Sequence, residues 1–302
     1  MRTWLTFLSI LGLITLSAGA QPLLSTQPKS EAPPKAPARP QPQPSVKPAD
    51  PIGQAKALFE RGQPKQALVL LDGALERDPK HTQMRAMRAG IRESVGLGEL
   101  AKQDYDYILN ENPKDARALH LRGWLQFTLG NPTAAVADFD RVLELNPGQR
   151  PHHWQRGIAC YFAEQFQEGR RQFELHQTVN SQDVENAVWH FLCVSKLDGV
   201  DKARAALIDI TGDRRVPLKE VQALFAGKGT EGSVLDAAKS PALKGAKEPL
   251  FYAHLYLGLY YEALGKPEKC LEHMVLATTD FSMPGPMGDV ARLHRLMREK
   301  KK

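Results

Sequence analysis

The chain has 302 residues, of which 42% are hydrophobic and 25% are charged, and its formal net charge is +6 at pH 7. This balance is close to that of ordinary globular proteins. The basic residues are interspersed with acidic ones, and the lysines at 300–302 form only a short tail. The composition therefore excludes an arm that binds nucleic acid.

The first segment of the chain is typical of a signal peptide for export. Arg2 supplies a positive charge, residues 4–16 are apolar, and Ala18 and Ala20 are small residues at the positions that signal peptidases read. The apolar stretch is shorter than the about 20 residues that cross a membrane. We predict a signal peptide over residues 1–20 and a mature chain without an integral membrane span, periplasmic or secreted. An uncleaved N-terminal anchor is the alternative.

Residues 21–50 are rich in proline. Proline fixes φ and has no amide hydrogen to donate, so this composition builds neither helices nor strand ladders. The sequence predicts a disordered linker here. It would either tether the following part of the chain to a surface or be a spacer left after processing.

A regular pattern begins after the linker. Pro79, Pro113 and Pro147 are spaced 34 residues apart, and each follows the end of a predicted helix. Twelve residues before each proline lies an alanine, and four residues further on lies a large apolar side chain. Residues four apart share one face of a helix, and a small residue there lets a second helix pack closely. The slots are Ala67 and Leu71, Ala101 and Tyr105, Ala135 and Phe139, Gly169 and Phe173, and Ala203 and Leu207.

The helix that precedes each of these has a small residue of its own, and the turn between the helices carries glycine, often followed by proline. A 34-residue unit with these features resembles the tetratricopeptide repeat (TPR). The resemblance implies an all-α fold, a right-handed superhelical solenoid of antiparallel helix pairs. In that fold residues 51–217 form TPR units one to five, residues 218–250 a helical insertion, and residues 251–302 a sixth TPR-like unit and a capping helix.

The later part of the chain has a narrower resemblance. The stretches at 188–192 and 251–265 are similar to the bacterial NlpI-type envelope TPR proteins. That resemblance implies a periplasmic adaptor that gathers cell-wall enzymes or proteases. The lipid-bearing cysteine of those proteins is absent after Ala20, so the resemblance does not extend to membrane anchoring.

The TPR resemblance also implies a binding face. The first helix of each unit lines a concave groove, which in TPR proteins receives extended or helical peptides. Tryptophan and tyrosine are enriched where binding energy concentrates, because they bury large rigid surfaces. The alternative is that some of these aromatic residues only pack between neighbouring helices. The predicted peptide-binding residues are Arg117, His120, Trp124, Phe127, Trp154, Ile158 and Tyr161.

Arginine recurs at one position of the first helix, as Arg88, Arg122 and Arg156. Such a ladder could hold a carboxylate of a bound peptide. However, Asp104 and Asp138 recur on the second helix of units that also carry the arginine. Because repeated positions of a solenoid usually serve packing, we predict structural ion pairs of Arg88 with Asp104 and of Arg122 with Asp138.

Motifs for catalysis are missing. The histidines between 152 and 190 lack zinc-site spacing, and no Gly-x-Ser-x-Gly turn or phosphate-binding loop occurs. The three cysteines, Cys160, Cys193 and Cys270, are predicted to be buried thiols, with a Cys160–Cys193 bridge as the alternative. We therefore predict no enzymatic activity, no cofactor and no metal site.

Together these observations predict an exported TPR scaffold in the cell envelope that binds peptide segments of partner proteins in its concave groove. Proteins or peptides are the expected partners, nucleic acid is not, and a homo-oligomer is compatible with the sequence. The alternatives are a metal-dependent hydrolase that uses residues 152–190 and a repeat protein that only self-associates. The main prediction requires a groove that the chain itself does not fill.

Overall fold

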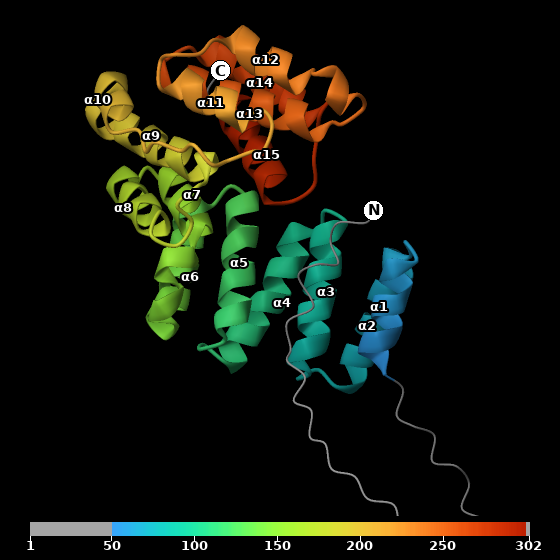
Figure 1. Cartoon of the computed structure of the whole chain (residues 1–302). Coiled ribbons are helices and arrows are strands. Elements are labelled where there is room, and N and C mark those ends of the chain that lie inside the picture. Colours follow the sequence, from blue (N-terminus) through green and yellow to red (C-terminus); the bar gives the residue numbers. More distant parts are fainter. Residues whose placement is uncertain (1–49, 300–302) are drawn as a thin grey trace, which may run out of the picture. The chain divides into compact units, whose positions relative to one another are not determined.

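The computed structural model describes residues 50–299, and within this range it is all-helical (Figure 1). The prediction of an all-α solenoid is confirmed. The predicted signal peptide and nearly all of the proline-rich linker lie outside the described residues. Among the helices of residues 50–299, none combines the length and the apolar character that a membrane span needs.

Helices α1 to α8 form consecutive hairpins. They are α1 (Pro51–Glu60) with α2 (Pro64–Arg77), α3 (Thr82–Ser94) with α4 (Gly98–Glu111), α5 (Ala116–Thr128) with α6 (Pro132–Leu145), and α7 (Trp154–Phe162) with α8 (Phe166–His176). A 3-10 helix, η2 (Pro147–His152), precedes α7.

The turn inside each hairpin needs a residue in the left-handed region. Gly62, Gly96 and Gly130 have φ values of 75°, 79° and 85°. Glycine adopts these values without the steric cost that a Cβ atom brings. Glu164 occupies the corresponding position of the fourth hairpin with φ 59°, so the turn keeps its geometry where the sequence departs from the pattern.

Small residues let the paired helices approach closely. A Cβ atom added at Gly123 would lie 2.7 Å from Phe139 Cε1, and one added at Gly157 would lie 2.6 Å from Phe173 Cζ. Any larger residue at these positions would separate the helices, since both distances are far below a van der Waals contact. The small and large slots of the sequence pattern therefore meet face to face.

The remaining helices follow a less regular course. They are α9 (Val184–Asp198), α10 (Val200–Ala205), α11 (Leu218–Phe225), α12 (Glu231–Ala238), the 3-10 helix η3 (Pro241–Leu243), α13 (Glu248–Ala263), α14 (Pro267–Thr278) and α15 (Pro286–Glu299). Arg215 fastens the connection before α11 to the start of α9, because its guanidinium lies 2.6 Å from Asp183 and 2.5 Å from Glu185.

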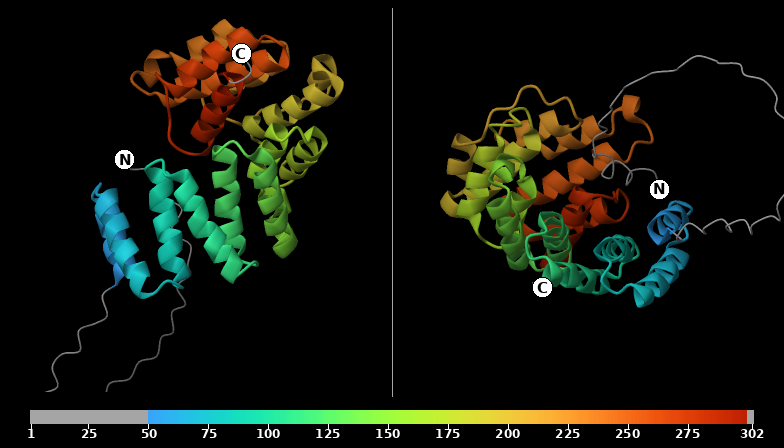
Figure 2. Two further views of the ribbon diagram at one scale, coloured as in Figure 1. Left: turned by 180° about the vertical axis from the view of Figure 1, so that it is seen from behind. Right: turned by 90° about the horizontal axis from the view of Figure 1, so that it is seen from below.

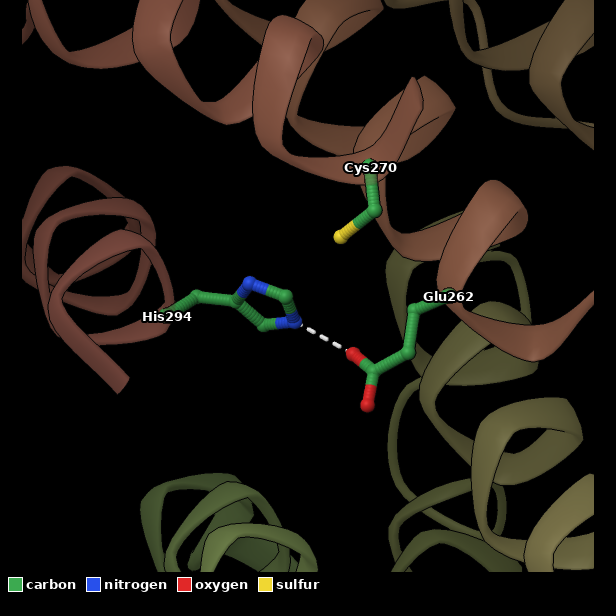
Figure 3. A group of neighbouring side chains, drawn as sticks. All are labelled: Glu262, Cys270 and His294. Atoms are coloured by element: carbon green, nitrogen blue, oxygen red, sulfur yellow. Dashed lines mark hydrogen bonds and ion pairs between the residues drawn. The ribbon is translucent and has the colours of Figure 1, made fainter. Parts of the chain in front are cut away.

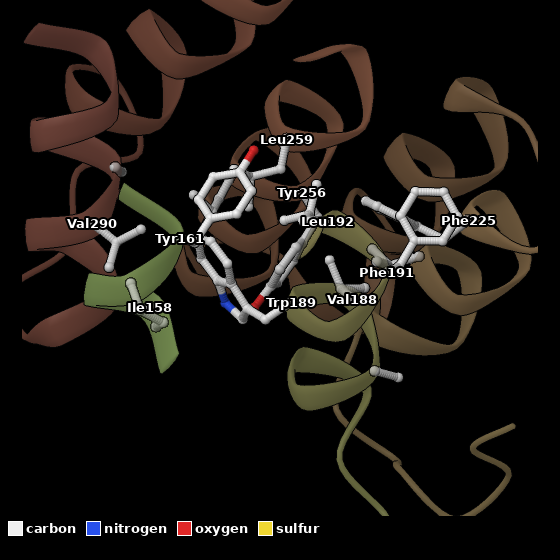
Figure 4. Close-up of a cluster of buried hydrophobic side chains, with 14 of the residues drawn as sticks. Ile158, Tyr161, Val188, Trp189, Phe191, Leu192, Phe225, Tyr256, Leu259 and Val290 are labelled. Carbon is white, nitrogen blue, oxygen red and sulfur yellow. The ribbon is translucent and has the colours of Figure 1, made fainter. Parts of the chain in front are cut away.

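The buried side chains are divided unequally along the chain. One large cluster extends from α5 to α15, and Trp189 lies within it beside Tyr161, their ring centroids 5.5 Å apart (Figure 4). The hairpins α1–α2 and α3–α4 contribute mainly to two smaller clusters. The C-terminal part is thus a thick core, whereas α1 to α4 form a thin layer of helix pairs.

Candidate functional site

The arginine ladder is built into the packing between units. Arg88 donates through Nη2 to Asp104 Oδ1 at 2.5 Å and through Nη1 to Asp72 Oδ1 at 2.7 Å. Arg122 does the same one unit later, donating to Asp138 Oδ1 at 2.6 Å and to Asp106 Oδ1 at 2.9 Å. The structure therefore brings each predicted arginine and aspartate together, and each arginine also reaches back to the preceding unit.

The contacts of these arginines with the preceding unit follow a repeat pattern that the sequence analysis did not use. Asp72, Asp106 and Asp140 share the 34-residue spacing of the repeat, and Arg156 Nε donates to Asp140 Oδ1 at 2.5 Å. Each arginine thus joins two adjacent units through charge-assisted hydrogen bonds. The guanidinium groups are engaged in this ladder, which leaves them poorly placed to hold the carboxylate of a peptide.

Asp104 is the most buried carboxylate of the ladder, with 1% of its surface exposed. Besides Arg88, it accepts a hydrogen bond from Arg92 Nη1 at 2.7 Å and a weaker one from Arg85 Nη1 at 3.4 Å. These arginine side chains are themselves only 13% to 16% exposed. A buried charge remains tolerable when it is paired in this way.

The predicted peptide-binding residues fall into two groups. Arg117 is exposed, and His120, Trp124 and Trp154 are partly buried. Phe127, Ile158 and Tyr161 belong to the hydrophobic core, with 0%, 1% and 4% exposure. A peptide does not reach these last three side chains in this structure, which corrects their assignment to an open groove.

The physical reason is that α15 returns to the inner side of the repeat. Trp124 Nε1 donates to Asp289 Oδ2 of α15 at 2.9 Å, and the ring centroids of Phe162 and His294 lie 5.9 Å apart. Figure 1 shows the first turn of α15 beside the end of α5, and the rest of α15 continues beyond the ends of α1 to α6, as both Figure 1 and the left view of Figure 2 show. The expectation of a groove open along its whole length is therefore wrong over the C-terminal halves of α5 and α7.

The inner face of α3 remains open. Gly90 lies 34 residues before Trp124, so it occupies the same repeat position and faces the same side as the residue that meets α15. A Cβ atom at Gly90 would meet nothing within 4 Å. Gln83 on α3 and Lys56 on α1, which also occupy inner positions of the repeat, are exposed. Together with Arg117 they outline the accessible part of the concave face.

Glu93 marks the border between the open and the filled part. Its Oε1 accepts a hydrogen bond from Tyr105 Oη at 2.7 Å. Burial raises the pKa of the Glu93 carboxyl to about 7, the Tyr105 hydrogen bond opposes this, and the negative charge of Asp289 on α15 adds to it. Near neutral pH the carboxyl is therefore only partly ionised.

Glu93→Gln should remove a pH dependence of stability. The folded chain holds a proton at Glu93 that the unfolded chain releases above its ordinary pKa of 4.5, so the stability of the wild type falls as pH rises from 4.5 to about 7. Glutamine keeps an acceptor for Tyr105 without the charge. We expect the variant to be more stable than the wild type by about 3 kcal/mol at pH 8 and equally stable at pH 4.5.

Urea unfolding at both pH values measures this difference, with Glu111→Gln, an exposed glutamate on α4, as the control. A Glu93→Gln variant that is less stable than the wild type at pH 8 would mean that the carboxylate is favourably paired when charged.

A second cluster fastens α15 to the neighbouring helices. Among the described residues, Glu262, Cys270 and His294 have ligand atoms within 4.8 Å of one another (Figure 3). Burial raises the pKa of the Cys270 thiol to about 12, so the thiol is protonated. Glu262 Oε1 already accepts from Lys196 Nζ at 3.1 Å and from Arg298. Two positive charges beside the carboxylate would repel a metal ion, and the arrangement is better suited to joining α9, α13 and α15.

Paired helices, their close contacts and the repeating ion pairs define the class as a helical repeat solenoid. Residues 95–150 match the family model of the tetratricopeptide repeat. Residues 95–150 therefore match a tetratricopeptide repeat, and the described residues have the fold of a tetratricopeptide-repeat solenoid. No curated protein matches the sequence.

Solved structures share the fold at low sequence identity. A tetratricopeptide repeat protein from Parabacteroides merdae ATCC 43184 is 17% identical with a TM-score of 0.56, covering 83% of this chain and 98% of that chain. YrrB, described as a TPR protein with an unusual peptide-binding site, is 20% identical with a TM-score of 0.50, covering 59% of this chain and 90% of that chain. At this identity the likeness extends to the fold alone.

Proposed function

We propose that this chain is an exported TPR scaffold that binds a peptide segment of a partner protein on the open concave face of α1, α3 and the first half of α5. The observation that carries the proposal is the contrast along the inner face. One repeat position is partly buried on α5 as Trp124 and buried on α7 as Ile158, but it is exposed on α1 as Lys56 and on α3 as Gly90. We infer a binding role rather than a catalytic one.

The chemistry of this face favours an extended segment. Gly90 presents backbone without a side chain, with open space above it, so a peptide could approach α3 closely. Lys56 and Arg117 add positive charges at its two sides, and charged groups at the edge of an interface assist encounter and orientation. A peptide-binding site is described for YrrB, which has the same fold, and this supports the use of a TPR surface in this way.

Location and organisation are part of the same proposal. The signal-peptide pattern of residues 1–20 supports export to the cell envelope, periplasmic or secreted. We place TPR units one to five at 51–217, the helical insertion at 218–250 and the sixth unit with its capping helix at 251–302. The partner would be a protein of the same compartment.

The test compares two glycines that sit within helices. The full chain, its Gly90→Tyr variant and its Gly73→Tyr variant are used to recover partners from an envelope extract. Neither glycine has an atom within 4 Å of an added Cβ, so both variants should fold, but Gly73 lies on α2. We expect Gly90→Tyr to lose specific partners and Gly73→Tyr to keep them, as read by mass spectrometry. If both variants recover the same partners, the open face of α1 and α3 is not the binding site.

A further inference from the structure

The first hairpin ends the row of repeats, and the groove between its helices differs from that of the next hairpin. Figure 1 shows α1 and α2 at the end of the row that α1 to α6 form. In the second hairpin three arginines of α3 cover Asp104, and the Arg85 guanidinium lies 3.6 Å from the centre of the Tyr107 ring. Leu70 and Gly73 stand 34 residues before Asp104 and Tyr107. The first hairpin is therefore apolar where the second is ionic and filled.

The side chains that fill this groove in the second hairpin have no large counterparts in the first. Leu58 of α1 occupies the repeat position of Arg92. A Cβ atom added at Gly73 would meet nothing within 4 Å. An open groove of about 510 Å³ results between α1 and α2, with Leu58, Val69, Leu70 and Gly73 among its lining residues. Apolar surface that remains in water favours association.

The same face of α2 carries both a projecting side chain and an empty space. Val69 is 72% exposed, which makes it the most exposed large apolar residue in the range 50–299. Gly73, one turn further along α2, leaves the space open. Residues four apart share one face of a helix. Two copies of this face are therefore complementary when the helices run antiparallel, as an interface with twofold symmetry requires.

The charges on α2 fit the antiparallel arrangement. Lys65 near the start of the helix and Glu76 near its end are both exposed. With 3.6 residues per turn, they lie on the same side of the line through Val69 and Gly73. When Val69 of each copy meets Gly73 of the other, Lys65 of one copy lies beside Glu76 of the other, and this pair occurs twice. A parallel arrangement would place the two copies of Lys65 together instead.

We propose that the α1–α2 end of the chain is a dimer interface, in which α2 packs antiparallel against α2 of a second copy about a twofold axis. Val69 of each copy fills the groove at Gly73 of the other, and two Lys65–Glu76 ion pairs lie at the rim. This surface lies on α2, whereas Gly90 lies on the inner face of α3. Dimer formation and the binding of a partner protein can therefore fail independently.

Sedimentation equilibrium of the purified full chain measures the dimer. One helix pair buries less than the about 800 Å² per partner of tight complexes, so we expect a Kd of about 1–100 µM. Val69→Asp places a charge in the groove of the other copy and should raise the Kd at least about tenfold. Leu296→Asp, at a side chain of α15 that is 51% exposed, is the control and should dimerise as the wild type does.

Charge reversal tests the register of the two helices. Lys65→Glu and Glu76→Lys each place like charges together, so each should raise the Kd by about fivefold. The variant with both substitutions should regain the affinity of the wild type, because both ion pairs form again with the charges exchanged. Circular dichroism checks the helix content of each variant. Val69, Lys65 and Glu76 are exposed, so their substitution leaves the core unchanged.

Gly73→Tyr fills the groove with a side chain of its own copy, so this variant should lose the dimer and still recover the partners of the open face. A wild type that is monomeric at about 100 µM would overturn the proposal, because the groove would then be covered by another part of the chain or by a different protein. A dimer that Val69→Asp retains would overturn it as well. So would a variant with both charges reversed that dimerises no better than either single variant.

Discussion

Asp104→Ala should lower the free energy of unfolding by about 3–5 kcal/mol, the cost of removing one partner from a buried ion pair. Asp104 accepts from Arg88 and Arg92 at 2.5 Å and 2.7 Å, and the carboxylate is 1% exposed. Without it, two mostly buried guanidinium groups lose their main countercharge. Neither can be neutralised by losing a proton, so the variant must either bury the charge or open the interface between α3 and α4.

The matched control is Asp72→Ala, which removes the other acceptor of Arg88. The side chain of Asp72 is 49% exposed, so its pair is screened by solvent and should contribute no more than about 1 kcal/mol. Urea unfolding of both variants gives the comparison. Equal losses in the two variants would show that burial does not set the strength of these pairs.

The arginine–aspartate ladder shows which contacts the repeat period of the sequence can predict. Arg88 and Asp104 could be paired from the sequence because each recurs with the unit, and one helix pair brings recurring positions together. The same argument applied to Asp72 and Asp106 would have found the contacts between units. The all-α solenoid and the TPR resemblance were predictable for the same reason, since every unit repeats the small and large slots that fix helix packing.

The position of α15 was not predictable in this way. Trp124 and Asp289 are 165 residues apart. Their contact does not recur from unit to unit, so no regular spacing in the sequence predicts it. Phe127, Ile158 and Tyr161 have the residue types of a binding groove as well as those of a core. Whether these three side chains line a groove or belong to a core depends on the path of the chain after α8, where the repeat pattern weakens.

Glu262→Gln should lower the free energy of unfolding by about 2–4 kcal/mol, somewhat less than Asp104→Ala. The carboxylate is 5% exposed and accepts from Lys196 of α9 and Arg298 of α15, whose side chains are 30% and 27% exposed. Glutamine keeps the shape and one acceptor but removes the charge between two cations. Their partial exposure lets solvent recover part of the loss.

His294 contributes differently to the same carboxylate. Burial, together with the smaller effect of the Lys196 charge, lowers the pKa of its imidazole to about 3. The ring is therefore neutral at physiological pH, and its Nε2 donates a hydrogen bond to the Glu262 carboxylate rather than forming an ion pair. A glutamine carbonyl can accept that bond, so the cost of Glu262→Gln should come from the two cations.

Glu164→Gln separates this effect from a general change of charge. Glu164 and Glu262 line one small cavity, but Glu164 is exposed, so its neutralisation should change stability by less than about 0.5 kcal/mol. Thermal or urea unfolding distinguishes the two variants. If Glu262→Gln unfolds together with the wild type, Lys196 and Arg298 must turn to solvent without loss, and the Glu262 ion pairs would then contribute nothing to holding α15.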